Sequence, residues 1–177
     1  MSRWPIAEDA ELRILSHGDS GEVFEAIERN RGRLGEYLPW VHLTHGVADV
    51  EGFIAGSAAQ HSSGLGFHAG IFLSGRLMGC AGIHPIDRLH RNVSIGYWID
   101  AGVEGRGLVT KAAGELVRIC FADYGLHRVE IRCAVGNERS RAIALRLGFR
   151  EEGILRGAQL VNGRWLDLRV FGRLADD

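Results

Sequence analysis

The sequence predicts an α+β fold, and three observations support this class. Antiparallel strand patterns fill most of residues 67–99, ahead of a glycine-rich turn into a long helix, which excludes a doubly wound parallel sheet. A strand–helix–strand unit then covers 93–135, and such a crossover joins two parallel strands. The chain closes with a hairpin, predicted by Asn162-Gly163 between two strand-like segments.

Length, charge and cysteine content restrict the class of protein. The chain has 177 residues, which suits a single domain over 1–177, and no apolar run approaches the roughly 18 residues of a membrane span. Its formal net charge of −1 provides no basic field for nucleic acid or an anionic membrane. Cys80, Cys120 and Cys133 are odd in number and widely spaced, which indicates free thiols in a reducing compartment. We therefore expect a cytoplasmic protein that binds phosphate only locally, if at all.

The first third of the chain predicts one strand and two helices. Residues 6–16 have the pattern of a strand, and Gly18-Asp19-Ser20-Gly21 offers a helix start. That helix ends before Pro39, because proline disfavours a helical conformation in the residue before it. A second helix is predicted around 50–58, so an aromatic loop over 37–45 joins the two helices.

Two histidines in this aromatic loop, His42 and His45, have a spacing that metal ligands can have. No Cys, Asp or third His accompanies them nearby, whereas a metal site needs three or four ligands. We therefore expect solvated loop histidines and no metal.

The middle of the chain predicts three strands and then a long helix. The strands are expected at 67–73, 76–84 and 93–99, and the last alternates apolar with small or polar residues. Glycines at 102, 105 and 107 end this alternation. From Val109 to Cys120 the apolar residues follow the spacing of one helical face.

A glycine-rich turn between a strand and a helix can bind an anion. It leaves backbone N–H groups unpaired at the positive end of the helix dipole, and glycine lets the anion approach closely. Phosphate is the natural ligand, with Arg106, Thr110 and Lys111 as further donors. Taken alone, Gly105-Arg106-Gly107 is better explained as an ordinary turn, since neither the P-loop nor the Rossmann fingerprint fits. The surrounding motifs must decide.

The last third predicts a strand, a short helix and the hairpin. Residues 128–135 alternate cleanly, with the apolar residues on one face. Gly125 is expected to end the long helix in the left-handed conformation, and Asn137 to cap a short helix that stops at Gly148. The strands at 93–99 and 128–135 should run parallel.

Several short motifs occur in the order and at the spacings of a known family, the GNAT acyl-CoA N-acetyltransferases, which the chain resembles over about residues 12–174. They are Ile95-Gly96-Tyr97-Trp98-Ile99, Gly105-Arg106-Gly107-Leu108-Val109-Thr110, Val129-Glu130-Ile131-Arg132, Asn137-Glu138-Arg139-Ser140, Leu147-Gly148-Phe149 and Glu152-Gly153. Leu38-Pro39-Trp40 and Gly82-Ile83-His84-Pro85-Ile86-Asp87 are similar to the RimJ/RimL branch, which acetylates the N-termini of ribosomal proteins. The motifs are specific in combination, although each alone is weak.

This resemblance implies a GNAT fold and a site for acetyl-CoA as the cosubstrate. The fold would be a mixed, mostly antiparallel sheet whose two parallel central strands splay apart below a bulge, flanked by about four helices. Pantetheine would pair with the free strand edge at Trp98, Ile99 and Asp100. The diphosphate would lie on Glu104, Gly105, Arg106, Gly107, Leu108, Val109 and Thr110.

At the implied cofactor site, one position departs from the family pattern and another has a second, structural explanation. Glu104 stands where the family has Gln or Arg, and a carboxylate beside a diphosphate would be repelled. We therefore expect Glu104 to point outward, with backbone N–H groups and Arg106 contacting the phosphates. Asn137 matches the family's pantetheine-binding Asn, although it is also explained as an N-cap.

The chemistry implied by the resemblance is attack of an amine on the acetyl thioester. Backbone N–H groups near Ile99 would polarise the carbonyl. Ser140 matches the family position near the sulfur and would donate a hydrogen bond to the leaving thiolate, although a helix first-turn serine is the alternative. The family's catalytic Glu matches Gln159 here, so its proton-accepting carboxylate is missing. His84 and Glu130 are the substitutes, and each also has a structural explanation.

The acceptor is expected to be a protein N-terminal α-amine. Its pKa near ~8, against ~10.4 for lysine, leaves roughly a tenth of it neutral at neutral pH, so a strong base is not needed. Tyr37 and Trp40, with Gln159, resemble the acceptor-side wall, unless the aromatic residues only anchor the helices. A small amine, polyamine or antibiotic acceptor, or a non-catalytic acyl-CoA-binding module, are the alternatives. Family analogy suggests a homodimer.

Overall fold

One eight-stranded sheet forms the framework of the protein, whose structure, a computed structural model, describes residues 2–177. The strand order is β1-β2-β3-β4-β5-β6-β8-β7. The strands are β1 Arg3–Ala7, β2 Ala10–Ile14, β3 Phe67–Leu73, β4 Arg76–Ile83, β5 Asn92–Ile99, β6 Arg128–Ala134, β7 Arg150–Val161 and β8 Arg164–Leu174. The α-helices are α1 Ser20–Leu34, α2 Val47–Ser62, α3 Leu108–Arg118 and α4 Glu138–Arg146. All neighbouring strands are antiparallel except β5 and β6, so the predicted α+β class is confirmed.

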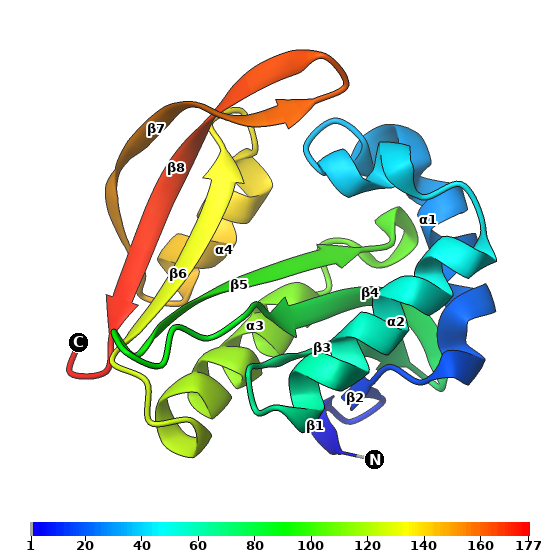
Figure 1. Cartoon of the computed structure of the whole chain (residues 1–177), viewed down its shortest axis with the longest axis horizontal. Helices are drawn as coiled ribbons and strands as arrows, with labels where there is room; N and C mark the ends of the chain where they lie inside the picture. The colour runs from blue at the N-terminus through cyan, green and yellow to red at the C-terminus, as the bar shows by residue number, and fades with distance from the viewer. Residues whose placement is uncertain (1) are drawn as a thin grey trace.

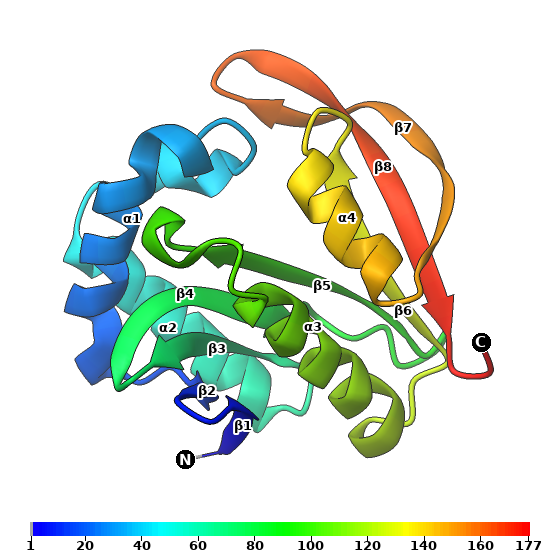
Figure 2. The same cartoon turned by 180° about the vertical axis from the view of Figure 1, so that it is seen from behind.

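The helices cover the two ends of the sheet differently (Figures 1 and 2). Helices α1 and α2 lie on one face of the β2–β5 region, and α3 lies on the other. Successive side chains of a strand point to opposite faces of the sheet, so one strand contributes to both apolar layers. Ile71 belongs to the apolar cluster that contains α3, and its neighbour Phe72 belongs to the cluster of α1 and α2. Helix α4 packs on β6 and β7. No helix within residues 2–177 combines the length and apolar character that a membrane crossing requires.

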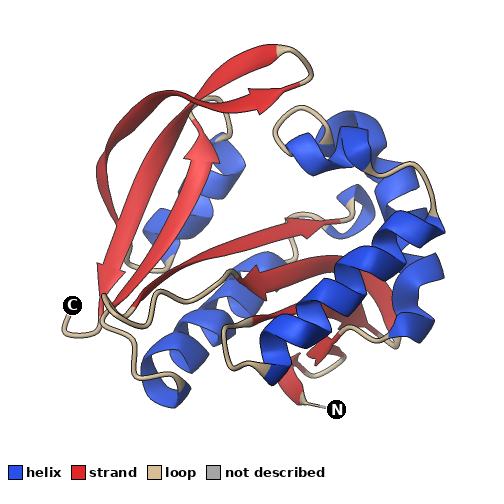
Figure 3. Cartoon of the chain, in the orientation of Figure 1, coloured by secondary structure: helices blue, strands red, loops and turns tan. Residues whose placement is uncertain are grey.

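The parallel pair at the centre of the sheet separates after a short contact. Only Asn92↔Arg128, Val93↔Val129 and Ser94↔Glu130 are in register. The strands then diverge, as Figure 3 shows, so 95–99 of β5 and 131–134 of β6 have no pairing with each other. We call these two unpaired segments the splay. The splayed parallel strands expected from the family resemblance are confirmed.

Two details of the predicted sheet were wrong. The segment 6–16 is not one strand, because it holds the end of β1, a turn and β2, which form a hairpin that pairs Trp4 with Leu12. Its first strand is stabilised by the ring of Trp4, which stacks on Phe67 with ring centroids 5.0 Å apart. The expected bulge near Ile99 is also absent, because the β4–β5 register runs from Gly79↔Ile99 to Ile83↔Ile95 without a shift.

The predicted chain reversals are confirmed. Gly125 and Gly148 end their helices with φ of 62° and 78°, values that favour glycine. The side chain of Asn137 caps α4 by accepting the Ser140 N–H at 3.1 Å. Asn162 and Gly163 have φ of 46° and 76°, and they join β7 to β8 as a two-residue turn.

Candidate active site

The loop between β5 and α3 is held in place by a buried side chain of α1. Asn30 accepts the Ala101 N–H at 2.9 Å and donates to Asp100 at 3.0 Å. Asp100 also accepts the Gly102 N–H at 2.8 Å. Burial raises the pKa of Asp100, but these hydrogen bonds outweigh it, and its pKa lies below the usual value. The oxygen and the nitrogen of the Asn30 amide therefore both fix the start of the loop.

The glycine turn that follows presents unpaired backbone donors. Within residues 2–177, the N–H groups of Gly105, Arg106, Gly107 and Leu108 donate no hydrogen bond. Gly105 and Gly107 have φ of 76° and 74°, left-handed values that favour glycine, and Gly107 directly precedes α3. Unpaired N–H groups at a helix N-terminus attract phosphate. The side chain of Arg106 is exposed and has no ion-pair partner among residues 2–177, so it is available to the same anion.

Glu104 does not point outward into solvent as we expected. Its carboxylate accepts hydrogen bonds from Arg33 of α1 and from Arg139 of α4, each at 2.7 Å. The side chain is 25% exposed. Two guanidinium groups compensate its charge, which explains how a carboxylate can lie beside a loop suited to phosphate.

Two hydroxyl groups meet where α4 begins. Ser140 Oγ lies 3.1 Å from the hydroxyl of Tyr97 on β5, so this pair links β5 to the first turn of α4. Burial raises the pKa of Tyr97 to about 12, with a small opposing effect from the Ser140 bond. Burial also raises the pKa of the neighbouring Cys133 thiol, partly offset by its hydrogen bond with Ser140. The cluster is therefore protonated at neutral pH and can donate hydrogen bonds.

The three predicted acceptor-side residues are Tyr37, Trp40 and Gln159, of which Tyr37 and Gln159 contact each other. Gln159 donates to the Tyr37 carbonyl at 2.7 Å, and the Tyr37 hydroxyl donates to Gly136 at 3.2 Å. These bonds join the aromatic loop to β6 and β7. The ring of Trp40 lies 6.2 Å from that of Trp98 and packs with the cluster of α1 and α2.

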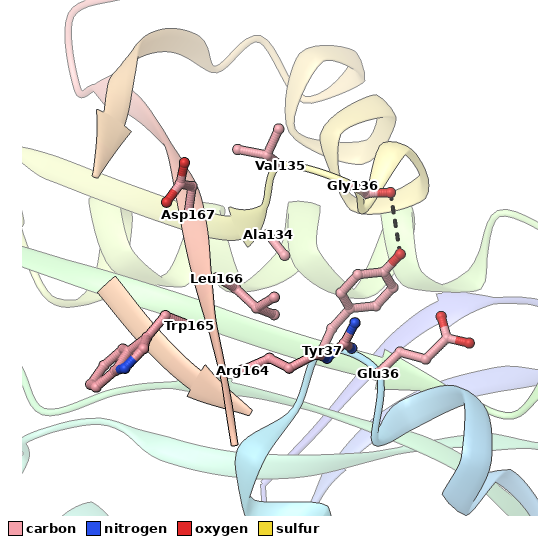
Figure 4. Close-up of a pocket in the computed structure, with 9 residues that line it drawn as sticks. All are labelled: Glu36, Tyr37, Ala134, Val135, Gly136, Arg164, Trp165, Leu166 and Asp167. Atoms are coloured by element: carbon pink, nitrogen blue, oxygen red, sulfur yellow. Dashed lines mark hydrogen bonds between the residues drawn. The ribbon is translucent and has the colours of Figure 1, made fainter. Parts of the chain in front are cut away.

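A cavity of about 570 Å³ lies between the aromatic loop and the ends of β6 and β8 (Figure 4). Figure 4 shows Tyr37 on one side, bonded to Gly136, with Trp165 and Asp167 on the opposite side. The cavity is lined by Glu36, Tyr37, Ala134, Val135, Gly136, Arg164, Trp165, Leu166 and Asp167. It therefore combines aromatic surface with charges of both signs.

The two candidate bases have different surroundings. The ring of His84 lies over Gly96, where a Cβ would come within 2.9 Å of Nε2, and edge-on to His68 at 5.7 Å. Although the residue remains solvent-exposed, protein atoms crowd its ring, and this desolvation lowers the pKa of His84. Glu130 is bound by Arg128 and Arg132. Burial raises its pKa, but these bonds outweigh burial and hold the pKa of Glu130 below its usual value.

The loop histidines have no metal-site geometry. His42 Nε2 lies 2.9 Å from the Gly35 carbonyl, and the backbone N–H of His45 donates to Asp49 at 2.7 Å. Across residues 2–177, no three His, Cys, Asp or Glu side chains are grouped closely enough to hold a metal ion.

Comparison with known proteins decides the family. A family model described as an acetyltransferase (GNAT) domain matches residues 10–150. The chain belongs to this family. The candidate ribosomal N-acetyltransferase YdaF of Bacillus subtilis (strain 168) is 36% identical over 171 residues, covering 96% of this chain and 93% of YdaF. The ribosomal-protein-serine acetyltransferase of Escherichia coli (strain K12) is 28% identical over 171 residues, covering 97% and 96%.

The fold of this N-acetyltransferase is also found among solved structures. RimL, a ribosomal α-N-protein acetyltransferase in complex with coenzyme A, superposes with a TM-score of 0.94 at 23% identity, covering 98% of each chain. The predicted GNAT fold and N-acetyltransferase activity are confirmed. The RimJ/RimL-like character of the chain is confirmed by the same relatives.

Several residues of the site were missed by the sequence analysis. Arg33, Arg139 and Tyr97 carry no local signal that links them to the loop or to Ser140. Asn30 did carry one, because it interrupts the apolar face of α1 formed by Val23, Ala26, Ile27 and Leu34. A buried polar side chain requires hydrogen-bond partners, so such an interruption indicates a structural or functional contact.

Proposed function

We propose that this acetyltransferase transfers the acetyl group of acetyl-CoA directly to the α-amine of a protein N-terminus. The observation that carries the cofactor assignment is the set of unpaired N–H groups at 105–108, placed at the end of the splay. The acceptor class is supported by YdaF and the Escherichia coli relative, whose names refer to ribosomal proteins and which match this chain along nearly all its length.

Acetyl-CoA would extend along β5 from the glycine turn toward α4. Its diphosphate would bind the N–H groups of 105–108 and Arg106, with Val109 and Thr110 in the first turn of α3. Pantetheine would pair with the free edge of 98–100, as an added strand does. Asn137 uses its side-chain oxygen to cap α4, and its amide nitrogen has no partner within residues 2–177. That nitrogen is therefore available to a pantetheine carbonyl, and the residue serves both predicted roles.

Ser140 would stabilise the leaving thiolate. A hydroxyl does not give up its proton outright, but it donates a hydrogen bond that strengthens as charge develops on sulfur. The Tyr97 hydroxyl, 3.1 Å away, can in turn donate to Ser140. The two side chains would then share the developing charge, and neither would have to ionise.

His84 is the proposed proton acceptor for the amine. Gln159 cannot accept a proton at neutral pH, and its amide is already bonded to Tyr37. Glu130 is engaged by two arginines, which favours a structural role for it. His84 lies on the face of the sheet that α1 and α2 cover, beside β5, and its lowered pKa keeps the imidazole neutral at pH 7. The requirement on it is modest, because part of an α-amine is already neutral.

Release of CoA thiol from acetyl-CoA, measured across a panel of acceptors, tests the proposal. The panel holds ribosomal-type N-terminal peptides, the same peptides with blocked N-termini and one lysine, polyamines and aminoglycosides. We expect the free N-terminal peptides to give the highest kcat/KM. Equal turnover on lysine side chains would contradict the α-amine assignment, and faster turnover of polyamines or aminoglycosides would identify a small-molecule enzyme. No release with any amine, together with tight acetyl-CoA binding, would identify a binding module.

The assembly and location belong to the same proposal. Apolar side chains are exposed on the β7–β8 hairpin, including Leu160 at 47% and Trp165 at 67%, and such a patch suits a homodimer contact. Sedimentation velocity of the protein and of Trp165→Ser checks this. The cysteines Cys80, Cys120 and Cys133 are free, which supports a cytoplasmic location.

A further inference from the structure

Glu104 joins two arginines that come from opposite sides of the splay. Arg33 belongs to α1, which packs on the β4 side, and Arg139 belongs to the first turn of α4, which follows β6. Both donate to the Glu104 carboxylate at 2.7 Å. The carboxylate itself directly precedes the unpaired N–H groups of 105–108. The ion bridge therefore crosses the end of the splay at the point where a diphosphate would bind.

The two arginines are held very differently. Arg33 donates not only to Glu104 but also to Asn30 at 3.1 Å and to the Ile99 carbonyl, and its side chain is 31% exposed. Arg139 has Glu104 as its one partner within residues 2–177, and its side chain is 74% exposed. An exposed ion pair contributes little stability, so Arg139 can leave Glu104 at small cost while Arg33 stays in place.

A bound diphosphate would weaken the ion pair between Glu104 and Arg139. It would repel the Glu104 carboxylate and attract the Arg139 guanidinium, which binds phosphate oxygens through two parallel hydrogen bonds. Because Arg33 keeps Glu104 neutralised after Arg139 has moved, the exchange leaves no unpaired carboxylate beside the phosphates.

We propose that Glu104 is a positioning residue. In the free protein it binds Arg139 at the end of the splay, and Arg139 moves from Glu104 to the diphosphate when an acyl-CoA binds. This inference rests on the proposed function and deepens it. It assigns Arg139 to cofactor binding, and it makes Glu104 a competitor of the diphosphate. The two substitutions therefore have opposite effects. Glu104→Gln removes the competing charge and strengthens CoA binding, whereas Arg139→Gln removes a phosphate ligand and weakens it.

Calorimetric titration with CoA and with pantetheine, which lacks the diphosphate, tests the exchange. We expect Glu104→Gln to lower the Kd for CoA about two- to fivefold and Arg139→Gln to raise it by a similar factor, the range of an exposed ion pair. In the double variant Glu104→Gln/Arg139→Gln the gain from Glu104→Gln should largely disappear. Pantetheine binding should stay unchanged in all three proteins.

Matched controls separate this exchange from a general charge effect. Glu25→Gln on α1 and Arg156→Gln on β7 remove the same charges at exposed positions that have no ion-pair partner in the described part of the chain, and both should leave the Kd for CoA unchanged. An unchanged or higher Kd in Glu104→Gln would overturn the inference, and so would equal shifts for CoA and pantetheine. Failure of the unsubstituted protein to bind CoA at millimolar concentration would instead remove the proposed function itself.

Discussion

The two sides of the splay are built on different physical principles. The side that holds β1–β5 is packed on both faces, with α3 on one and α1 and α2 on the other, and its strands feed two apolar clusters. The side that holds β6, β8 and β7 is covered by α4 on one face (Figure 2). On its other face, Glu130 bridges Arg128 and Arg132, and Arg128 also pairs with Glu152.

This difference indicates how the site is assembled. The apolar side supplies the phosphate loop, whose shape is set by Asn30, and the charged side supplies Asn137 and Ser140 on a short helix. Besides three residue pairs of parallel sheet and the apolar cluster around α3, which Val129, Ile131 and Phe171 also enter, the two sides meet through polar contacts. Examples are the Tyr37 hydroxyl on Gly136 and the Tyr97 hydroxyl on Ser140. Apolar packing should therefore dominate stability, and these polar contacts should dominate the geometry of catalysis.

The largest effect on stability is expected from a substitution that creates a cavity in the apolar side. Leu12→Ala on β2, where the side chain has no exposed surface, should lower the free energy of unfolding by about 2–5 kcal/mol. The matched change Leu145→Ala on α4, where the side chain is 45% exposed, should cost at most about 0.5 kcal/mol. Urea unfolding measures both. Similar losses would show that the buried Leu12 contributes no more to stability than an exposed leucine.

A contact between the two sides should control turnover. Ser140→Ala removes a charge-assisted hydrogen bond of about 1.5–3 kcal/mol in the transition state, so kcat should fall roughly 10- to 150-fold. Stability should barely change, since the Asn137 side chain still accepts the backbone N–H of residue 140. The measurement is steady-state acetylation of the preferred peptide, with the exposed Ser62→Ala as control. A kcat equal to that of the unsubstituted protein, with chemistry rate-limiting, would remove Ser140 from the mechanism.

The pH dependence of stability should separate the two sides. Burial and the neighbouring His84 lower the pKa of His68, on the apolar side, from 6.5 to about 4. Its Nδ1 has no hydrogen-bond partner within the described residues 2–177. The unfolded chain then binds a proton before the folded one does, so stability is lost as pH falls from about 6.5 toward 4. Between pH 7 and pH 5 the loss should be about 2 kcal/mol.

Urea unfolding at the two pH values measures this loss. It should be clearly smaller in His68→Gln and unchanged in the exposed control His45→Gln. The carboxylates of the charged side, Glu130 and Glu152, have lowered pKa values and should matter only below about pH 4.5. A pH 5 loss as large in His68→Gln as in the unsubstituted protein would contradict the assignment to His68.

The smallest effect is expected from the charged network. Glu130→Gln leaves Arg128 paired with Glu152 and should cost about 1 kcal/mol of stability at low salt, and less in 1 M NaCl. The exposed Glu25→Gln serves as the control for charge alone. If Glu130 is structural, kcat should be unchanged at pH 7. A kcat loss of about 100-fold would instead make Glu130 the base.

Local sequence patterns predicted much of the fold, together with the glycine turn and the Asn137 cap of the site. The alternation at 128–135, the Asn137 cap and the Asn162-Gly163 turn each depend on neighbouring residues, so they are visible in the sequence. Strand β1 was missed because a short edge strand that contains Pro5 has little strand signal. The partners of Glu104 lie 71 and 35 residues away along the chain, and no periodicity reports such contacts.

The central claim is that the N–H groups after β5 bind the diphosphate of acetyl-CoA at the end of the splay. An amide-resolved NMR titration with CoA tests it directly. The signals of Gly105, Arg106, Gly107 and Leu108 should shift most, and those of β1 and β2 should stay in place. Shifts confined to other segments, or no shift at millimolar CoA, would contradict it.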